Sequence, residues 1–242
     1  GMMSLSQASG VIFGANVGTT ITAWLLSGTG AANSLNPSAY VPLIAAIGIG
    51  IHLFSRRERA RNIGSILLSF SVLMFGMQAM SGTAKPLAGD EHFLGLFQAI
   101  SNPAIGFLVG VVSAAALQSS SAAVGILQAI STSGALTVRG AIPILMGHCV
   151  GASAPVMISA IGAEREGKRT ALFYLTINLF GAAIGLAASG LLRDGRANPL
   201  KIAELHTGSR ILMAAILLPL SDRIEALVDR LPFRERSGAT ER

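Results

Sequence analysis

The clearest candidates for chemistry are four consecutive polar residues in the middle of an uncharged stretch, Gln118-Ser119-Ser120-Ser121. Their amide carbonyl and hydroxyl oxygens are ligands that hard cations prefer, and the hydroxyls can also donate hydrogen bonds to an anion. The surrounding stretch 103–134 is long enough to enter a bilayer, where polar groups are costly unless they face protein, ions or water. We therefore interpret the run as an ion or substrate site, with interhelical hydrogen bonding as the structural alternative.

A second pattern of small and polar residues occurs twice. The first copy is Gly14-Ala15-Asn16-Val17-Gly18-Thr19-Thr20, and a degraded copy is Gly147-His148-Cys149-Val150-Gly151-Ala152-Ser153. Glycines at the first and fifth positions let a membrane helix break and let its backbone approach a ligand. The same spacing also serves the packing of helices through small residues, and the spacing alone does not separate these two roles.

The side chains in these copies that could contact a substrate or ion are Asn16, Thr19, Thr20 and Ser153. A threonine hydroxyl can instead bond its own helix backbone, which is the alternative for the two threonines. His148 stands where the first copy has Ala15, and it is expected to be packed or to face a cavity.

The composition is that of an integral membrane protein. Of the 242 residues 51% are hydrophobic and 12% are charged, whereas soluble domains carry about 25% charged residues. Five uncharged stretches match or exceed the roughly 20 residues that span a bilayer; they cover 1–55, 62–84, 92–138, 140–163 and 170–192. The net charge of +6 comes from loops and the tail, which membrane topology explains better than nucleic-acid binding. The sequence contains no nucleotide phosphate-binding loop, nucleophile triad or metal-binding cluster, so neither an enzyme nor a cofactor is predicted.

Basic residues predict the orientation. The arginines of 56–61, the basic loop 165–169 and the tail 222–242 are placed in the cytoplasm, and Lys85, Asp90 and Glu91 then lie outside. Between this outer loop and the cytoplasmic loop that begins at Glu164, the chain must cross the membrane an odd number of times. Two apolar stretches, 103–134 and 140–163, lie in this interval, so one of them should not cross. As one straight helix, the stretch 103–134 would be about 45 Å long, against a hydrocarbon core of roughly 30 Å. It is therefore predicted to fold back as a re-entrant hairpin with the Gln-Ser-Ser-Ser run near its bend.

In this topology the two glycine-containing copies leave the membrane on opposite sides. The segment 27–40 after the first copy lies outside, and the loop that begins at Glu164, after the second copy, lies in the cytoplasm. This relation is typical of inverted-repeat transporters, whose sites form near the midplane from broken helices. The predicted fold is thus an all-α integral membrane protein, an inverted-repeat secondary transporter with a re-entrant hairpin and broken helices.

The two motifs together resemble those of the type II sodium–phosphate cotransporters and their bacterial relatives, in which each inverted repeat carries a copy of both. The resemblance extends to Asn178 and to His206-Thr207. It also implies a first Gln-Ser-Ser-Ser copy before residue 1. The last predicted span departs from the family at Gly208-Ser209-Arg210, where relatives have an apolar residue, Phe and Asn. His206 and Arg210 lie one turn apart near its outer end, so Arg210 is expected to reach the interface, with attraction of phosphate as the other role considered.

The resemblance implies sodium-coupled symport of inorganic phosphate across the cytoplasmic membrane by alternating access. Sodium, the coupling ion, is assigned to oxygens of Gln118, Ser119 and Ser120, while phosphate suits helix N-termini and backbone N–H groups. The expected partners are phosphate, sodium and the lipid bilayer; a homodimer is left open, and no nucleic acid is expected. Transport of another small anion, such as sulfate, and a non-transporting sensor or scaffold are the alternatives.

The chain divides into four expected parts. Residues 1–29 form the latter part of the first repeat, and 30–100 form linking transmembrane helices and an outer loop. Residues 101–192 form the second repeat, with its hairpin and broken helix, and 193–242 form the last transmembrane helix and a cytoplasmic tail.

Overall fold

The computed structural model describes residues 5–27, 37–87 and 102–230, and every regular element in these ranges is a helix. The elements are α1 (Leu5–Gly18), α2 (Thr20–Ser27), α3 (Pro37–Phe54), α4 (Glu58–Leu87), α6 (Pro103–Leu117), α7 (Ser120–Ser131), α8 (Val138–Gly151), α9 (Ala154–Ala160), α10 (Arg165–Ser189), α11 (Pro199–Leu217), a 3₁₀ turn (Leu218–Leu220) and α12 (Ser221–Asp229). The predicted all-α class is confirmed. Most of the outer segment 27–40, and the outer loop with Asp90 and Glu91, lie outside the described residues.

Four helical segments are long and apolar enough to cross a membrane: Gln7–Ser27, Glu58–Met80, Val138–Ala160 and Arg165–Ser189. Large apolar side chains remain exposed along them, as expected where lipid replaces water as the solvent. The protein is thus a multi-pass membrane protein. The helix predicted to be the last span, α11, is not among the four; it contains Lys201, Glu204 and Arg210.

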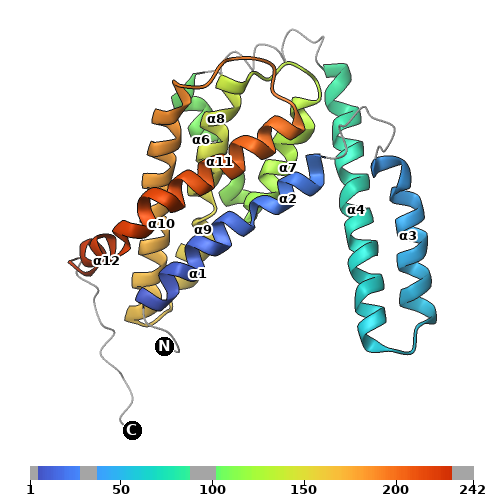
Figure 1. Cartoon of the computed structure of the whole chain (residues 1–242), viewed down its shortest axis with the longest axis horizontal. Coiled ribbons are helices and arrows are strands. Elements are labelled where there is room, and N and C mark those ends of the chain that lie inside the picture. The colour runs from blue at the N-terminus through green and yellow to red at the C-terminus, as the bar shows by residue number, and fades with distance from the viewer. Residues whose placement is uncertain (1–4, 28–36, 88–101, 231–242) are drawn as a thin grey trace.

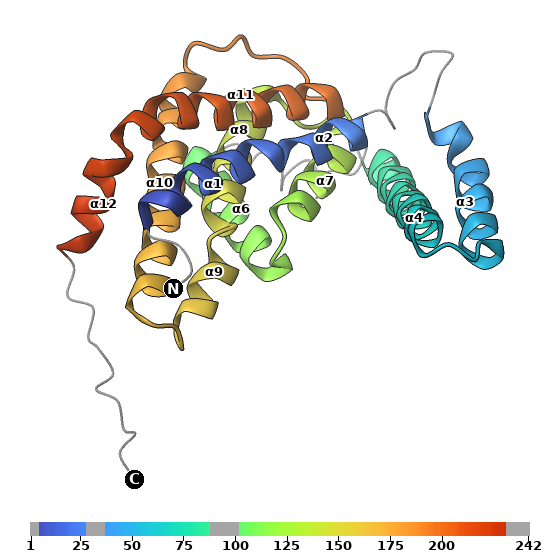
Figure 2. The same ribbon diagram turned by 60° about the horizontal axis from the view of Figure 1, so that its bottom comes forward.

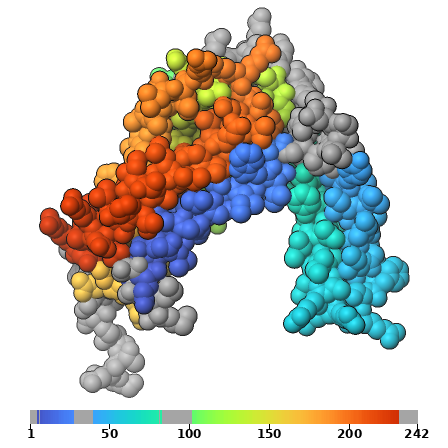
Figure 3. Space-filling view, in the orientation of Figure 1, coloured from blue at the N-terminus to red at the C-terminus, as the bar shows by residue number. Residues whose placement is uncertain are grey.

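The helices form one large group with a helical pair beside it (Figure 1). The pair is α3 and α4, and the group contains the other helices, with α1 and α2 running alongside α11 across its face (Figures 1 and 2). The pair is attached mainly where α4 contacts α7; there Met74 and Met77 are buried with Leu26, Val41 and Ala129. Figure 3 shows the surface hollowed between α4 and the α1–α2 side of the group.

The closest helix–helix contact in the large group is a glycine seam between α6 and α8, formed by Gly110, Gly147 and Gly151. A Cβ atom added to any of the three would lie within 3.0 Å of the facing helix backbone. At these three positions no side chain keeps the two helices apart, and their backbones pack directly against each other, as small residues allow in membrane helices.

A buried glutamine joins three helices near the other end of the hairpin. Gln128, on α7, is fully buried, and its Nε2 donates to the carbonyl of Ala23 at 2.8 Å and to that of Pro199 at 2.9 Å. These carbonyls belong to α2 and to the first turn of α11, so one amide group fixes the positions of both helices relative to α7.

Candidate functional site

The Gln-Ser-Ser-Ser run forms the turn between α6 and α7, so the predicted break in 103–134 is confirmed. Gln118 ends α6 with φ 52° and ψ 23°, the left-handed region, and Ser119 caps α7 by accepting a hydrogen bond from the Ala122 amide at 3.2 Å. Among the described residues Gln118 is the only non-glycine with positive φ. Such backbone strain persists where the surroundings enforce it and is frequent at functional sites.

The serines of this turn line an open cavity of about 410 Å³ between α2, α4 and α7. Ser119 and Ser121 contribute its polar groups, together with Thr22 of α2, and the remaining wall is apolar. Ser120 is half-buried at the first position of α7, whereas Gln118 is exposed and does not line this cavity. Hydroxyl-bearing residues of α2 and of the turn therefore meet at a cavity whose wall is mostly apolar.

Both glycine-containing copies interrupt a helix, and they do so after the same motif position. In the first copy α1 ends at Gly18 and α2 begins at Thr20; in the second α8 ends at Gly151 and α9 begins at Ala154. The glycines differ in their surroundings. A Cβ at Gly14 or Gly18 would meet no atom within 4 Å, whereas Gly147 and Gly151 form the seam with α6 described above. In the second copy, the glycines therefore allow the backbone of α6, and not a ligand, to approach α8 closely.

The hydroxyls of the first copy bond their own helix. Thr19 Oγ1 donates to the carbonyl of Ala15 at 2.7 Å, and Thr20 Oγ1 donates to that of Val17 at 2.8 Å. These bonds to the helix backbone are the structural alternative to a ligand-binding role that we considered for the two threonines. Their oxygens still have lone pairs that can accept a hydrogen bond or bind a cation.

Asn16 and Ser153, one from each copy, belong to a buried polar network centred on α10. Asn178 Nδ2 donates to Ser153 Oγ at 3.3 Å and to the carbonyl of Tyr174 at 2.8 Å. The Tyr174 hydroxyl donates to Asn16 Oδ1 at 3.4 Å. Asn178 Oδ1 accepts from Arg210 Nη1 at 2.6 Å. Side chains from α1, α10 and α11, and Ser153 from the α8–α9 break, thus converge in the interior.

The expected position of Arg210 at the interface is wrong. Its side chain is 2% exposed and turns inward toward Asn178. Tyr174, which links Asn16 to the network, was not among the residues predicted from the sequence. The available signal for Arg210 was its place one turn after His206 in an apolar stretch, because an arginine there must either reach water or find polar partners inside.

No hydrogen bond among the described residues links this network, which we call the α10 network, to the Gln118 turn. Apart from Thr19 and Thr20, which bond their own helix, the predicted site residues therefore fall into two groups. One is the hydroxyl-lined cavity at the turn, and the other is the buried α10 network that includes Asn16 and Ser153.

His148 faces a small cavity inside the hairpin. Its Nε2 lies 3.2 Å from Ser113 Oγ, and both residues line a cavity of about 120 Å³ between α6, α7 and α8. The cavity is otherwise apolar. This placement agrees with the expectation that His148 is packed or faces a cavity.

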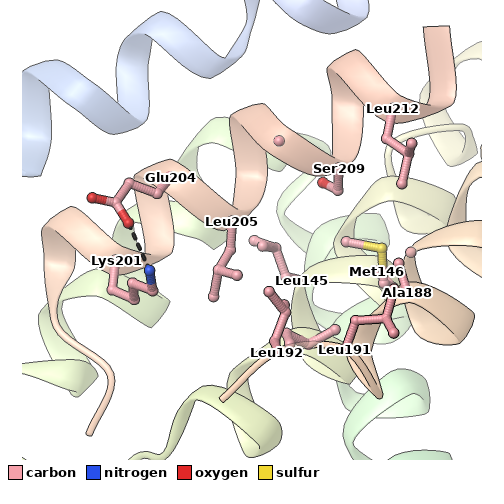
Figure 4. Close-up of a pocket in the computed structure, with 13 residues that line it drawn as sticks. Leu145, Met146, Ala188, Leu191, Leu192, Lys201, Glu204, Leu205, Ser209 and Leu212 are labelled. Atoms are coloured by element: carbon pink, nitrogen blue, oxygen red, sulfur yellow. Dashed lines mark hydrogen bonds and ion pairs between the residues drawn. The ribbon is translucent and has the colours of Figure 1, made fainter. Parts of the chain in front are cut away.

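A larger cavity of about 370 Å³ lies between α8, α10 and α11 (Figure 4). Leu145, Met146 and Leu205 form part of its apolar wall. At its edge, Lys201 Nζ and Glu204 Oε2 form an ion pair at 2.8 Å. The two charges are thus paired with each other at the edge of a mostly apolar cavity.

Sequence comparisons agree with these motifs. The sequence model of the family described as Na+/Pi-cotransporter matches residues 1–82 and 72–216. The "Uncharacterized protein YqeW" of Bacillus subtilis is 24% identical over 237 residues, which is 96% of this chain and 75% of that protein. The "Putative inorganic phosphate export protein YjbB" of Escherichia coli is 23% identical over 227 residues, 91% of this chain and 40% of that protein.

The human "Sodium-dependent phosphate transport protein 2B" is 33% identical over 117 residues, 45% of this chain and 17% of that protein. The chain therefore spans less than half the length of the E. coli and human relatives. No solved structure was found to match it. With the family model covering most of the sequence, the chain belongs to the Na+/Pi-cotransporter family.

Proposed function

We propose that the protein carries inorganic phosphate across the cytoplasmic membrane in symport with sodium, by alternating access between two inverted repeats. The observation that carries the proposal is that the α10 network includes a residue from each motif copy, Asn16 bonded to Tyr174 and Ser153 bonded to Asn178. Transporters built from inverted repeats form their sites near the membrane midplane from interrupted helices. The interruptions after Gly18 and Gly151, at equivalent motif positions, support that architecture.

Sodium binds at the hairpin turn in this proposal. Gln118 contributes its amide oxygen, and Ser119 and Ser120 contribute hydroxyl oxygens. The end of α6 at this turn also leaves backbone carbonyls without helical partners, and such carbonyls are sodium ligands in other transporters. The cavity beside Ser119 and Ser121 gives an ion access to the turn.

Two substitutions at Gln118 separate its side chain from its backbone. Gln118→Gly keeps the left-handed conformation and removes the amide oxygen, whereas Gln118→Asn keeps both an amide and tolerance of that conformation. We expect Gln118→Gly to raise the sodium concentration for half-maximal phosphate uptake at least about tenfold, the effect of losing one charge-assisted contact. The measurement is uptake of radiolabelled phosphate into proteoliposomes that hold the chain expressed from its complete gene.

Gln118→Asn is the matched control and should depend on sodium more nearly as the wild type does. If Gln118→Gly depended on sodium as the wild type does, the Gln118 amide would not be a sodium ligand. If phosphate uptake by the wild type were independent of sodium, phosphate transport would not be coupled to sodium. Competition by sulfate would test the other anions. Phosphate efflux down an outward-directed phosphate gradient, without sodium-driven uptake, would favour export, which the name of the E. coli relative suggests.

The inverted repeat predicts that the segments after the two copies lie on opposite sides of the membrane. In a Cys149→Ser background, single cysteines at Ser34 and Gly162 should react with an impermeant thiol reagent from opposite sides. Gly162 is exposed, and a side chain there would meet no atom within 4 Å. Reaction from the same side would exclude the inverted repeat.

A further inference from the structure

Arg210 is a buried positive charge without a counter-charge. Its side chain is 2% exposed, and among the described residues no carboxylate lies within ion-pair distance of it. Its neutral contacts are the Asn178 amide oxygen and, at 3.9 Å, the sulfur of Met213. Removing a guanidinium from water is costly, and a single neutral acceptor does not offset that cost.

The donors around this charge are also left without acceptors. Arg210 Nε is buried without a hydrogen-bond partner among the described residues, as is Asn16 Nδ2 at the other end of the α10 network. The buried ring nitrogen Nδ1 of His206, one turn before Arg210 on α11, also has no hydrogen-bond partner in the described part of the chain, and it is a donor in one tautomer of the ring. Buried donors in native proteins nearly always find acceptors. A cationic group with several unused donors is what an oxygen-rich anion requires.

We propose that Arg210 supplies the fixed positive charge of an occluded oxyanion site, with Asn178 orienting its guanidinium. A guanidinium presents donors in a planar fork that matches two oxygens of a tetrahedral oxyanion. The Asn178 amide oxygen uses one Nη1 hydrogen and leaves Nε free to bind the ligand. The identification of the anion as phosphate rests on the proposed function; the site itself rests on the buried charge.

This assignment gives the two groups of site residues different ligands. The hydroxyls and amide oxygen at the Gln118 turn suit a cation, whereas the α10 network has excess donors and a positive charge. Because Arg210 and Asn178 are buried, an anion reaches Arg210 only when the helices packed around it have moved apart.

The test measures two properties of Arg210→Gln and Arg210→Lys, in detergent, on the chain expressed from its complete gene. The first is the equilibrium affinity for inorganic phosphate, measured by isothermal titration calorimetry. The second is the melting temperature without phosphate. We expect Arg210→Gln to bind phosphate at least about 100-fold more weakly, and Arg210→Lys about tenfold more weakly because an ammonium lacks the fork.

The melting temperature distinguishes a ligand site from a structural role. If the guanidinium is present for an anion, its removal eliminates an uncompensated buried charge, so Arg210→Gln should melt at the same or a higher temperature than the wild type. A structural arginine would give a lower one. Arg139→Gln, at an exposed arginine on α8, is the matched control for loss of charge and should leave phosphate affinity unchanged.

Each outcome separates this inference from the proposed function. Unchanged phosphate affinity in Arg210→Gln overturns the anion site and leaves phosphate transport standing. A lower melting temperature of Arg210→Gln, combined with unchanged phosphate affinity in Arg210→Lys, has the same consequence. Binding of sulfate but not phosphate by the wild type, lost in Arg210→Gln, supports the anion site and overturns phosphate as its substrate. A wild type that binds neither anion overturns both.

Discussion

Replacing Gly147 with alanine is expected to leave little folded protein. The new Cβ would lie within 3.0 Å of the α6 backbone, at the carbonyl of Phe107 and the amide of Val111, and no side-chain rotation can relieve such a contact. Overpacking typically costs about 1–3 kcal/mol, and separating two helix backbones places this case at or above the upper end. The measurements are the yield of monodisperse protein in detergent and its melting temperature.

Gly14→Ala is the matched control, since it makes the same chemical change at the same position of the first motif copy. A Cβ at Gly14 meets no atom within 4 Å, so this variant should be as stable as the wild type or slightly more stable, because alanine favours the helix. Equal behaviour of the two variants would contradict the glycine seam. A loss of phosphate uptake in a stable Gly14→Ala would instead show that a ligand approaches that backbone.

Gln128→Met is expected to lower the free energy of unfolding by about 3 kcal/mol, since two buried carbonyls lose their donor. Methionine nearly conserves the volume, so packing changes little. The carbonyls of Ala23 and Pro199 face Gln128 Nε2 at 2.8 and 2.9 Å, and α2 and α11 would lose the group that positions them on α7. Thermal unfolding in detergent measures the effect.

Ser131→Ala is the control for this substitution. Ser131 is also buried on α7, but its hydroxyl donates only to the carbonyl of Gln128 in its own helix, so its loss should cost less than about 1 kcal/mol. A Gln128→Met variant as stable as Ser131→Ala would mean that the Ala23 and Pro199 carbonyls find other donors.

The positions of the helix breaks could be predicted, because the length of an apolar stretch and the placement of its glycines are visible in the sequence. A stretch too long for one crossing, with Gln118-Ser119 at its centre, had to bend, and the structure places the bend there. The interruptions after Gly18 and Gly151 likewise follow from glycines that weaken a helix locally. These are local properties, and they do not depend on which helices become neighbours.

Properties that depend on neighbouring helices could not be predicted. Gly14 and Gly147 occupy equivalent motif positions, yet only Gly147 faces another backbone, because α6 packs against α8. Arg210 was expected at the interface, since a long side chain near a helix end can reach water; the amide of Asn178 on α10 instead gives it an internal partner. Neither partner is visible in the local sequence.

The glycine seam determines which parts of the protein can move. Helices that touch through interlocked side chains can slide by exchanging rotamers, whereas at the glycine seam α6 and α8 meet backbone to backbone and have no rotamers to exchange. The two helices must therefore travel as one rigid body, and the hairpin turn at the end of α6 travels with them. The boundary between α7 and α4 is different, because Met77 and Met80 of α4 line the open cavity beside the turn serines. Flexible thioether side chains next to empty space can be displaced at little cost, so we expect a hinge or shear motion to occur at this boundary.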